Sequence, residues 1–232
     1  MKVIQLNTWH FKYLKEIIDF LKYEKPDVIN LQEVRSGRFN YCDPSIKEPF
    51  EELKTKLNMK GLFAPFSGLR SSDGTLSQSG NAFLTNLEIV DHGVFFEPSL
   101  PNYTEYTEDH DFIKTTILNE KSKYYNVFEE PNNCIWTVLK NKQGNYFRNL
   151  VSHFTVSYGC NETLQTIQQS RTVLNFLNNV KDLPTVFAGD LNIHDQSASV
   201  AMLSKKMKMV NKASNNSLNK LIHPIFKNQP DT

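Results

Sequence analysis

Apolar and polar positions alternate along the first residues of the chain and then change to a helical spacing. Residues 2–7 alternate as a strand does, residues 10–24 place their apolar side chains on one helical face, and residues 27–34 form a second apolar run after Pro26. The apolar face of the predicted helix consists of Phe11, Leu14, Ile17, Ile18 and Leu21. This order predicts a strand–helix–strand opening of an α/β fold.

The middle of the chain contains short strand-like runs separated by Gly, Asn, Pro and charged residues. These runs are 80–86, 88–96, 112–118, 134–140 and 145–156. Residues 140–145, "KNKQGN", predict a hairpin turn between the last two runs. Residues 98–111 are polar, aromatic and acidic, and they predict a long surface loop.

The last third of the chain predicts a helix, a strand and a second helix. The first helix covers about 162–180, with four aliphatic residues expected to face inward: Leu164, Ile167, Leu174 and Leu177. The strand covers 185–189, and a helix from about 196 to 208 follows, with Asp195 as its expected N-cap. Repeats and interdomain linkers are absent from the sequence, which predicts a single domain over residues 1–232.

The composition is that of an ordinary globular protein. Among 232 residues, 39% are hydrophobic and 22% charged, and the net charge of +1 gives no overall attraction to polyanions. The apolar runs are too short for a membrane span. Three cysteines without paired spacing favour a reducing compartment, so we expect a cytoplasmic protein.

Polar residues end three of the predicted strands. Asn7 ends the first, Glu33 lies near the end of the second, and Asp190 and Asn192 follow the apolar run at 185–189. Functional side chains collect at strand ends in α/β sheets, and carboxylate and amide oxygens suit Mg²⁺ or Mn²⁺. Each residue alone has an ordinary explanation: Asp and Asn form turns, and a single Glu is commonly solvated or paired.

These residues occur within a set of motifs that resembles a known family. The motifs "LNTW", "PDVINLQEV", "SGNAFLTN", "VSHFTV" and "FAGDLNIHD" resemble, in order, those of the endonuclease/exonuclease/phosphatase superfamily. The resemblance implies a deoxyribonuclease-I-like fold, a four-layer α/β sandwich in which two packed mixed β-sheets are flanked by helices. It also implies Mg²⁺-dependent (or Mn²⁺-dependent) hydrolysis of phosphate esters.

The resemblance assigns roles to individual residues. Glu33 matches a direct metal ligand, and Asn7 matches a residue that helps to hold the metal. Asp190 matches the aspartate beside the attacking water, and Asn192 the amide that orients the phosphate. His153 in "VSHFTV" matches a histidine that contacts a phosphate oxygen or assists the leaving group; the alternative is a core histidine bonded to a carbonyl.

The end of the chain departs from the family pattern. Members normally continue with an Asp-x-Ile-Phe strand and close with a Ser-Asp-His box, whereas this sequence ends in "HPIFKNQPDT". The Asp-His pairs at 91–92 and 109–110 come too early to serve as that box. We therefore expect a C-terminally incomplete domain that lacks its last strands, has an uncovered sheet edge open to self-association, and turns over poorly.

The sequence leaves the substrate open. Arg35 follows Glu33 and is a candidate phosphate-binding residue. A phosphodiesterase or nuclease acting on nucleic acid ranks first, and a phosphatase of small-molecule or lipid-headgroup phosphates ranks second. A third alternative is a catalytically silent phosphate-binding domain.

Overall fold

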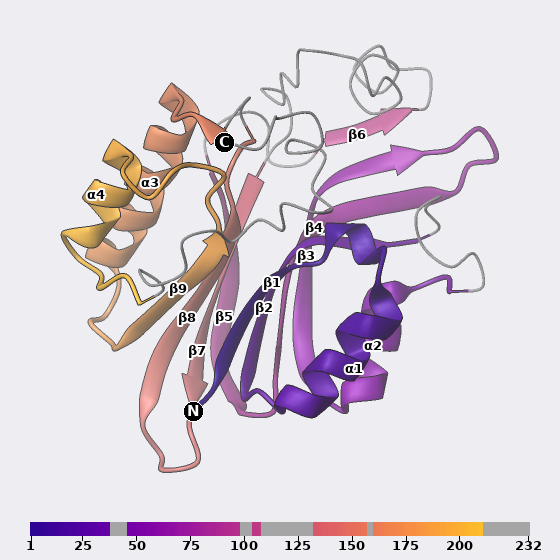
Figure 1. Ribbon diagram of the computed structural model, residues 1–232, viewed down its shortest axis with the longest axis horizontal. Helices are drawn as coiled ribbons and strands as arrows, with labels where there is room; N and C mark the ends of the chain where they lie inside the picture. Colours follow the sequence, from indigo (N-terminus) through magenta and orange to yellow (C-terminus); the bar gives the residue numbers. More distant parts are fainter. Residues whose placement is uncertain (38–45, 98–103, 108–131, 157–159, 211–232) are drawn as a thin grey trace, which may run out of the picture.

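Two β-sheets pack face to face between two layers of helices in the computed structural model (Figure 1). Helices α1 and α2 cover the outer face of the first sheet, and α3 and α4 cover that of the second (Figure 1). The predicted four-layer α/β sandwich is therefore confirmed. The structure describes residues 1–37, 46–97, 104–107, 132–156 and 160–210.

The first sheet has the strand order β1-β2-β4-β3-β6. Its strands are β1 (Val3–Asn7), β2 (Val28–Ser36), β3 (Lys60–Arg70), β4 (Leu76–Thr85) and β6 (Thr104–Thr107). The pairs β1–β2 and β3–β6 are parallel, whereas β2–β4 and β3–β4 are antiparallel. The sheet is therefore mixed, and the parallel β1–β2 pair brings Asn7 level with Gln32.

The second sheet has the order β5-β7-β8-β9. Its strands are β5 (Glu88–Glu97), β7 (Asn132–Lys140), β8 (Tyr146–His153) and β9 (Thr185–Asp190). Only the β8–β9 pair is parallel among these described strands, and it brings His153 level with Asp190. Gly189 lets the two strands approach, because a Cβ there would collide with the carbonyl oxygen of Ser152.

The helices are α1 (Leu14–Glu24), α2 (Pro49–Leu57), α3 (Leu164–Asn179) and α4 (Ala198–Ser204), with a short 3₁₀ turn η1 (Trp9–Phe11) before α1. The predicted apolar face of α1 is buried throughout. In α3, however, Leu164 is 69% exposed, so its predicted inward orientation is wrong. Thr163 caps this helix, so Leu164 occupies the first helical position, and the buried residues of α3 begin only at Thr166.

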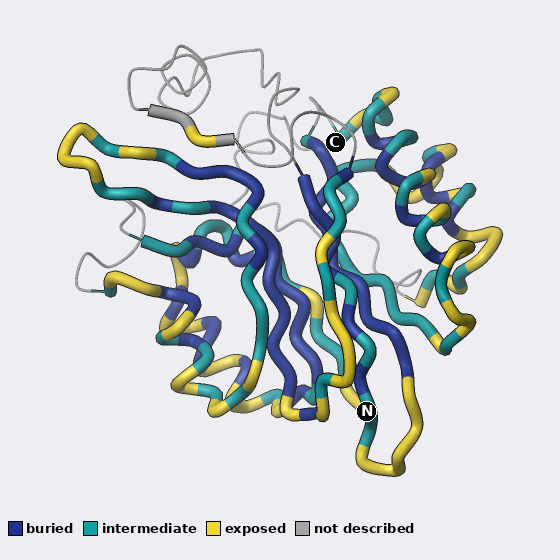
Figure 2. The backbone as a smooth tube through the Cα atoms, turned by 180° about the vertical axis from the view of Figure 1, so that it is seen from behind, coloured by how far each residue is buried: buried dark blue, intermediate teal, exposed yellow. Residues whose placement is uncertain are grey.

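Three apolar clusters fill the three interfaces between the four layers. One joins α1 and α2 to the first sheet, one lies between the sheets, and one joins α3 and α4 to the second sheet. In Figure 2 the buried backbone runs through the middle of both sheets, and exposed positions gather at the turns. Successive β2 residues face opposite sides, so Ile29 and Leu31 meet the helices while Val28 lies between the sheets.

The interface between the sheets becomes polar towards the carboxyl ends of β1 and β2. After Val28, the next β2 residues with this orientation are Asn30 and Gln32. Asn30 and Asn149 exchange two amide hydrogen bonds of 2.9 and 2.8 Å across the interface. Gln5 donates to Gln32 at 2.6 Å one step further along. A row of polar side chains therefore extends from the interface between the sheets to the end of the sandwich where Asn7 lies.

Most predicted elements correspond to observed ones, with three differences. The first helix begins at Leu14 and not near residue 10, because Trp9, His10 and Phe11 adopt left-handed backbone angles. Part of the predicted 98–111 loop forms β6, which pairs with β3. Ser197, whose Oγ accepts from the backbone N–H of Val200, caps α4 in place of the expected Asp195.

The predicted strand at 112–118 lies outside the described residues. The predicted hairpin turn is confirmed: Asn141 Oδ1 accepts from the backbone N–H groups of Gln143 and Asn145, and Gly144 has a φ of 86°. Among the described helices, none combines the length and hydropathy that a membrane crossing requires.

Candidate active site

The ends of β1, β2 and β9 meet where the two sheets come together. Asn7 Nδ2 donates to Glu33 Oε1 at 2.9 Å and to Asp190 Oδ2 at 3.1 Å. One amide group therefore connects a carboxylate of the first sheet to a carboxylate of the second. Glu33 and Asp190, which the sequence placed at separate strand ends, open towards the same point.

A bulge in β2 turns Glu33 towards this point. The register with β4 shifts between Leu31 and Val34, and Glu33 has a φ of 53°. Leu31 and Val34 both belong to the cluster under α1 and α2, so two residues lie between core positions that a regular strand would separate by one. Thr8 stabilises the bulge, because its Oγ1 donates to the carbonyl oxygen of Glu33 at 2.9 Å.

Asn192 and His153 lie on the other side of the carboxylates. Asn192 Nδ2 contacts His153 Nε2 at 2.9 Å and donates to the carbonyl oxygen of Phe154 at 2.8 Å. Asn192 has a φ of 50°, a conformation that asparagine tolerates better than most residues. Its backbone N–H donates to Asp190 Oδ1 at 3.1 Å, and His153 Nε2 lies 3.9 Å from Glu33 Oε1.

His10 is a site residue that the sequence analysis missed. Its Nε2 lies 3.3 Å from Glu33 Oε2, and its Nδ1 accepts from Arg35 Nε at 3.0 Å. It lies three positions after Asn7, in the turn that follows the same strand. This nearness in sequence to a candidate site residue was the signal that could have identified it. The apolar spacing predicted a helix from residue 10, whereas His10 has a left-handed φ of 58°.

Burial and neighbouring groups change the ionisation of this cluster. Burial, the largest influence, and the Arg35 guanidinium lower the pKa of His10 to about 4. His10 is therefore neutral at neutral pH. Burial is also the largest influence on Glu33 and raises its pKa, but His10, His153, the Asn7 donor and Arg35 outweigh it, so the pKa lies below its ordinary value. Glu33 is thus a carboxylate at neutral pH.

The structure brings five of the six predicted site residues around one point: Asn7, Glu33, His153, Asp190 and Asn192. Arg35, the sixth, is 8% exposed and lies behind His10. Asn7 is oriented with its oxygen accepting from the backbone N–H of Trp9 at 3.0 Å, so its nitrogen faces the carboxylates. The roles of these residues stay predictions.

The donor set fits a hard divalent cation. Two half-exposed carboxylates share one amide donor, and Mg²⁺ commonly uses one or two carboxylates while keeping several waters. Within the described ranges, no group of three or more His, Cys, Asp or Glu side chains is arranged to hold a metal. Glu33 is the predicted direct ligand, and Asp190 lies beside it on the same amide donor.

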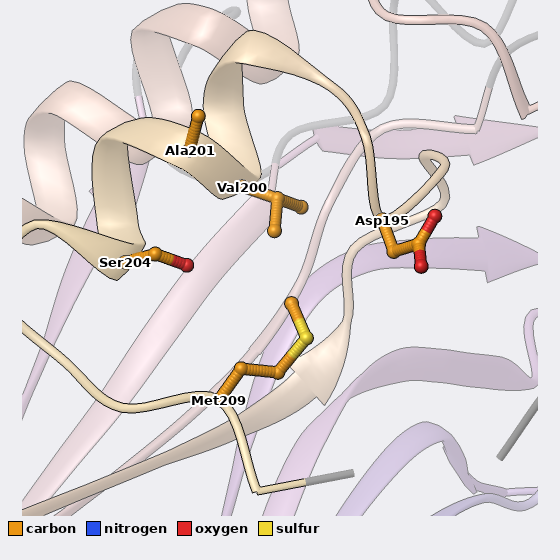
Figure 3. A pocket seen from close by; sticks show the side chains of 5 residues that line it. All are labelled: Asp195, Val200, Ala201, Ser204 and Met209. Atoms are coloured by element: carbon orange, nitrogen blue, oxygen red, sulfur yellow. The ribbon is translucent and has the colours of Figure 1, made fainter. Parts of the chain in front are cut away.

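A separate hollow lies beside α4 (Figure 3). Its lining combines residues of α4 with residues on either side of the helix: Asp195, Val200, Ala201, Ser204 and Met209. Asp195 follows the Asp190–Asn192 turn and is one of the lining residues, and its carboxylate points away from the other four labelled side chains (Figure 3). We assign no function to the hollow.

Residues 4–218 match the model of the endonuclease/exonuclease/phosphatase family. The chain belongs to this family. The family match covers every residue of the cluster, from Asn7 to Asn192. No curated protein matches the chain.

Solved structures with the same fold include enzymes of different specificity. The human Nocturnin catalytic domain with bound sulfate is 19% identical, with a TM-score of 0.57 over 99% of this chain and 76% of that one. The mannosyl-6-phosphatase of Bacteroides thetaiotaomicron is 16% identical, with a TM-score of 0.52 over 88% and 69%. TDP2 of D. rerio with a single-strand DNA product is 16% identical, with a TM-score of 0.53 over 88% and 64%. At these identities the likeness shows the fold.

Proposed function

We propose that this chain is a metal-dependent phosphoesterase that hydrolyses phosphodiester bonds, with nucleic acid as the favoured substrate class. The observation that carries the proposal is the Asn7 amide, which joins the Glu33 and Asp190 carboxylates beside the His153–Asn192 pair. Family membership supports the same reaction class. Glu33, with Asp190 beside it, would hold Mg²⁺ or Mn²⁺, which supplies positive charge to the phosphoryl group.

Asp190 is suited to orient the attacking water. Asn7 Nδ2 donates to one of its oxygens and the backbone N–H of Asn192 to the other, so the carboxylate plane is fixed. A carboxylate held in this way can accept a hydrogen bond from a water and then its proton as the P–O bond forms. Preorganisation of this kind lowers the entropic part of the barrier.

His153 and Asn192 are suited to hold the phosphoryl oxygens. His153 is 6% exposed and its Nε2 points to the Asn192 amide, so both polar groups are fixed before substrate binds. Donors directed at oxygens that gain charge stabilise the transition state most when they need no reorganisation.

An aromatic and cationic patch beside the cluster supports a nucleic-acid substrate. Trp9 and Tyr13 have ring centroids 6.1 Å apart, and Lys12 Nζ lies 4.3 Å from the Trp9 ring. Trp9 is tied to the site, because its backbone N–H donates to Asn7. Exposed aromatic rings next to a cation suit unstacked bases and the phosphate backbone of a single strand.

The test compares three substrates in the presence of Mg²⁺ or Mn²⁺ and after chelation with EDTA. They are bis-p-nitrophenyl phosphate, p-nitrophenyl phosphate and an end-labelled single-stranded oligonucleotide. We expect metal-dependent cleavage of the diester and the oligonucleotide, which Glu33→Gln and Asp190→Asn abolish and Glu51→Gln, an exposed carboxylate on α2, leaves intact.

Each other outcome has a defined meaning. Preference for the monoester would favour the small-molecule phosphatase alternative. Phosphate binding without turnover would favour the silent binding domain. Hydrolysis that survives both site substitutions would exclude the proposed site.

A further inference from the structure

The turn between β1 and α1 holds His10 in an unusual conformation. Trp9, His10 and Phe11 have φ angles of 46°, 58° and 60°, which side chains other than glycine rarely adopt in succession. Each such residue costs of order ~1 kcal/mol or more, so neighbouring contacts must stabilise the turn. Burial of Phe11 and the bond from Trp9 to Asn7 are two such contacts. The result is that His10 points back towards Glu33.

The hydrogen bonds of His10 fix which ring nitrogen carries the proton. Arg35 Nε can only donate, so the His10 Nδ1 atom that it meets at 3.0 Å must accept. In a neutral ring the proton then resides on Nε2, the atom 3.3 Å from Glu33 Oε2. Arg35 therefore donates to His10, and the Nε2 proton of His10 faces Glu33.

Glu33 consequently has a different polar neighbour at each oxygen. Asn7 donates to Oε1, and His10 Nε2 lies 3.3 Å from Oε2. These two groups lie three positions apart, at the end of β1 and in the turn that follows it, and together they restrict the rotation of the carboxylate. Arg35, at 8% exposure, is held behind the imidazole and not on the open side of the cluster.

We propose that Arg35 and His10 act as a positioning pair for Glu33, through which Arg35 sets the tautomer of His10 and His10 sets the orientation of the metal-binding carboxylate. This inference rests on the proposed function. It replaces direct phosphate binding as the role of Arg35. Hydrogen-bond partners of metal ligands typically change metal affinity or activity about 10–100-fold when they are removed.

Two amide substitutions of different length at His10 test the proposal. The Gln side chain in His10→Gln reaches as far as Nε2 and can donate to Glu33, whereas the shorter Asn side chain in His10→Asn reaches only the Nδ1 position. Asn also tolerates the left-handed backbone, so His10→Asn should fold. We expect Mn²⁺ affinity, measured by isothermal titration calorimetry, to fall about 10–100-fold in His10→Asn and to stay within about threefold of wild type in His10→Gln.

Matched control variants distinguish a loss of Glu33 positioning from a general loss of stability. Arg35→Met should lower Mn²⁺ affinity, while Arg148→Met, which removes another buried arginine whose guanidinium donates to the carbonyl oxygen of Lys181, should lower only stability. His92→Phe, at an exposed position of β5, should change neither. Equal Mn²⁺ affinity in wild type, His10→Asn and His10→Gln would overturn the proposal.

A second measurement needs no metal. Ring ¹⁵N chemical shifts of His10 in the metal-free protein should show the Nε2–H tautomer, and Arg35→Met should let the Nδ1–H form appear. An Nδ1–H tautomer in the wild type would contradict the proposed bond direction. If the wild type shows the expected tautomer but neither hydrolyses phosphate esters nor binds Mn²⁺, the proposed function is rejected.

Discussion

Asn7 donates to Asp190 at 3.1 Å although 183 positions separate the two residues in the chain. The same nitrogen donates to Glu33, so one amide holds together two carboxylates that would otherwise repel each other. This bridge crosses from the first sheet to the second. It makes the cluster depend on how the two sheets are packed.

Replacing Asn7 with leucine, which has a similar size but no donor, should separate the carboxylates. We expect kcat/KM for bis-p-nitrophenyl phosphate to fall about 10–100-fold, in line with the loss of a partner to metal ligands. Asn179→Leu is the control, because that amide donates only locally to the carbonyl oxygen of Asn175 in α3. Equal rates for the two variants would show that the bridge has no role in catalysis.

Asp190→Asn should remove the proposed proton acceptor for the attacking water. The expected loss in kcat is about 10²–10⁴-fold, the usual contribution of general acid–base groups. The melting temperature should change little, because the side chain is half-exposed. Asp19→Asn, at a position whose carboxylate is 61% exposed in α1, is the matched control and should keep full activity.

His153 and Asn192 should contribute to catalysis as one unit. A double-mutant cycle with His153→Ala and Asn192→Gly should give an interaction energy of about 0.5–3 kcal/mol in kcat/KM, since residues in contact are not additive. Glycine is chosen because residue 192 has a left-handed backbone. A cycle of His153→Ala with Asn58→Gly, at the left-handed end of α2, should be additive; additivity in both cycles would refute the coupling.

The free energy of unfolding should decrease as pH rises, because of Glu97. Burial, the largest influence, raises the pKa of this carboxyl from 4.5 to about 8, against the opposing hydrogen bonds of Ser152 and Gln169. Between these values the folded chain keeps a proton that the unfolded chain has released. The free energy of unfolding therefore decreases as pH rises, by up to about 1.4 kcal/mol per pH unit, and levels off above pH 8.

Glu97→Gln should remove this slope. The amide can donate to Ser152 and accept from Gln169, as a protonated carboxyl does. Urea unfolding between pH 5 and 8 measures the difference between variant and wild type. Glu88→Gln, at an exposed position of the same strand, should keep the wild-type slope, and parallel curves for Glu97→Gln and wild type would contradict the assignment.

The Asn30–Asn149 pair should stabilise the packing of the two sheets. Asn30→Leu leaves the Asn149 amide buried without its partner, so we expect a loss of about 1–3 kcal/mol in the free energy of unfolding. The double variant Asn30→Leu/Asn149→Leu should recover part of that loss, because both polar groups are then removed. A double variant as unstable as the sum of both single variants would contradict this.

Local patterns predicted many of the fold elements, although not α2 or β3, because each pattern depends on nearby residues. The alternation in residues 2–7, the Asn141–Gly144 turn and the apolar face of α1 are fixed by strand period, turn chemistry and helix period. Family motifs then indicated which strand ends are candidates for a site. The sequence therefore named Asn7, Glu33, His153, Asp190 and Asn192 before any contact was known.

Tertiary structure alone decided how these residues meet. The bulge at Glu33 arises because Leu31 and Val34 both pack under the helices, and a two-residue period cannot predict that shift. His10 reaches Glu33 only because three residues adopt left-handed angles that the surrounding packing stabilises. Arg35, two positions after Glu33 in β2, meets His10 through a hydrogen bond to Nδ1. Local propensity determines helices and strands, whereas contacts between distant segments determine which atoms share a site.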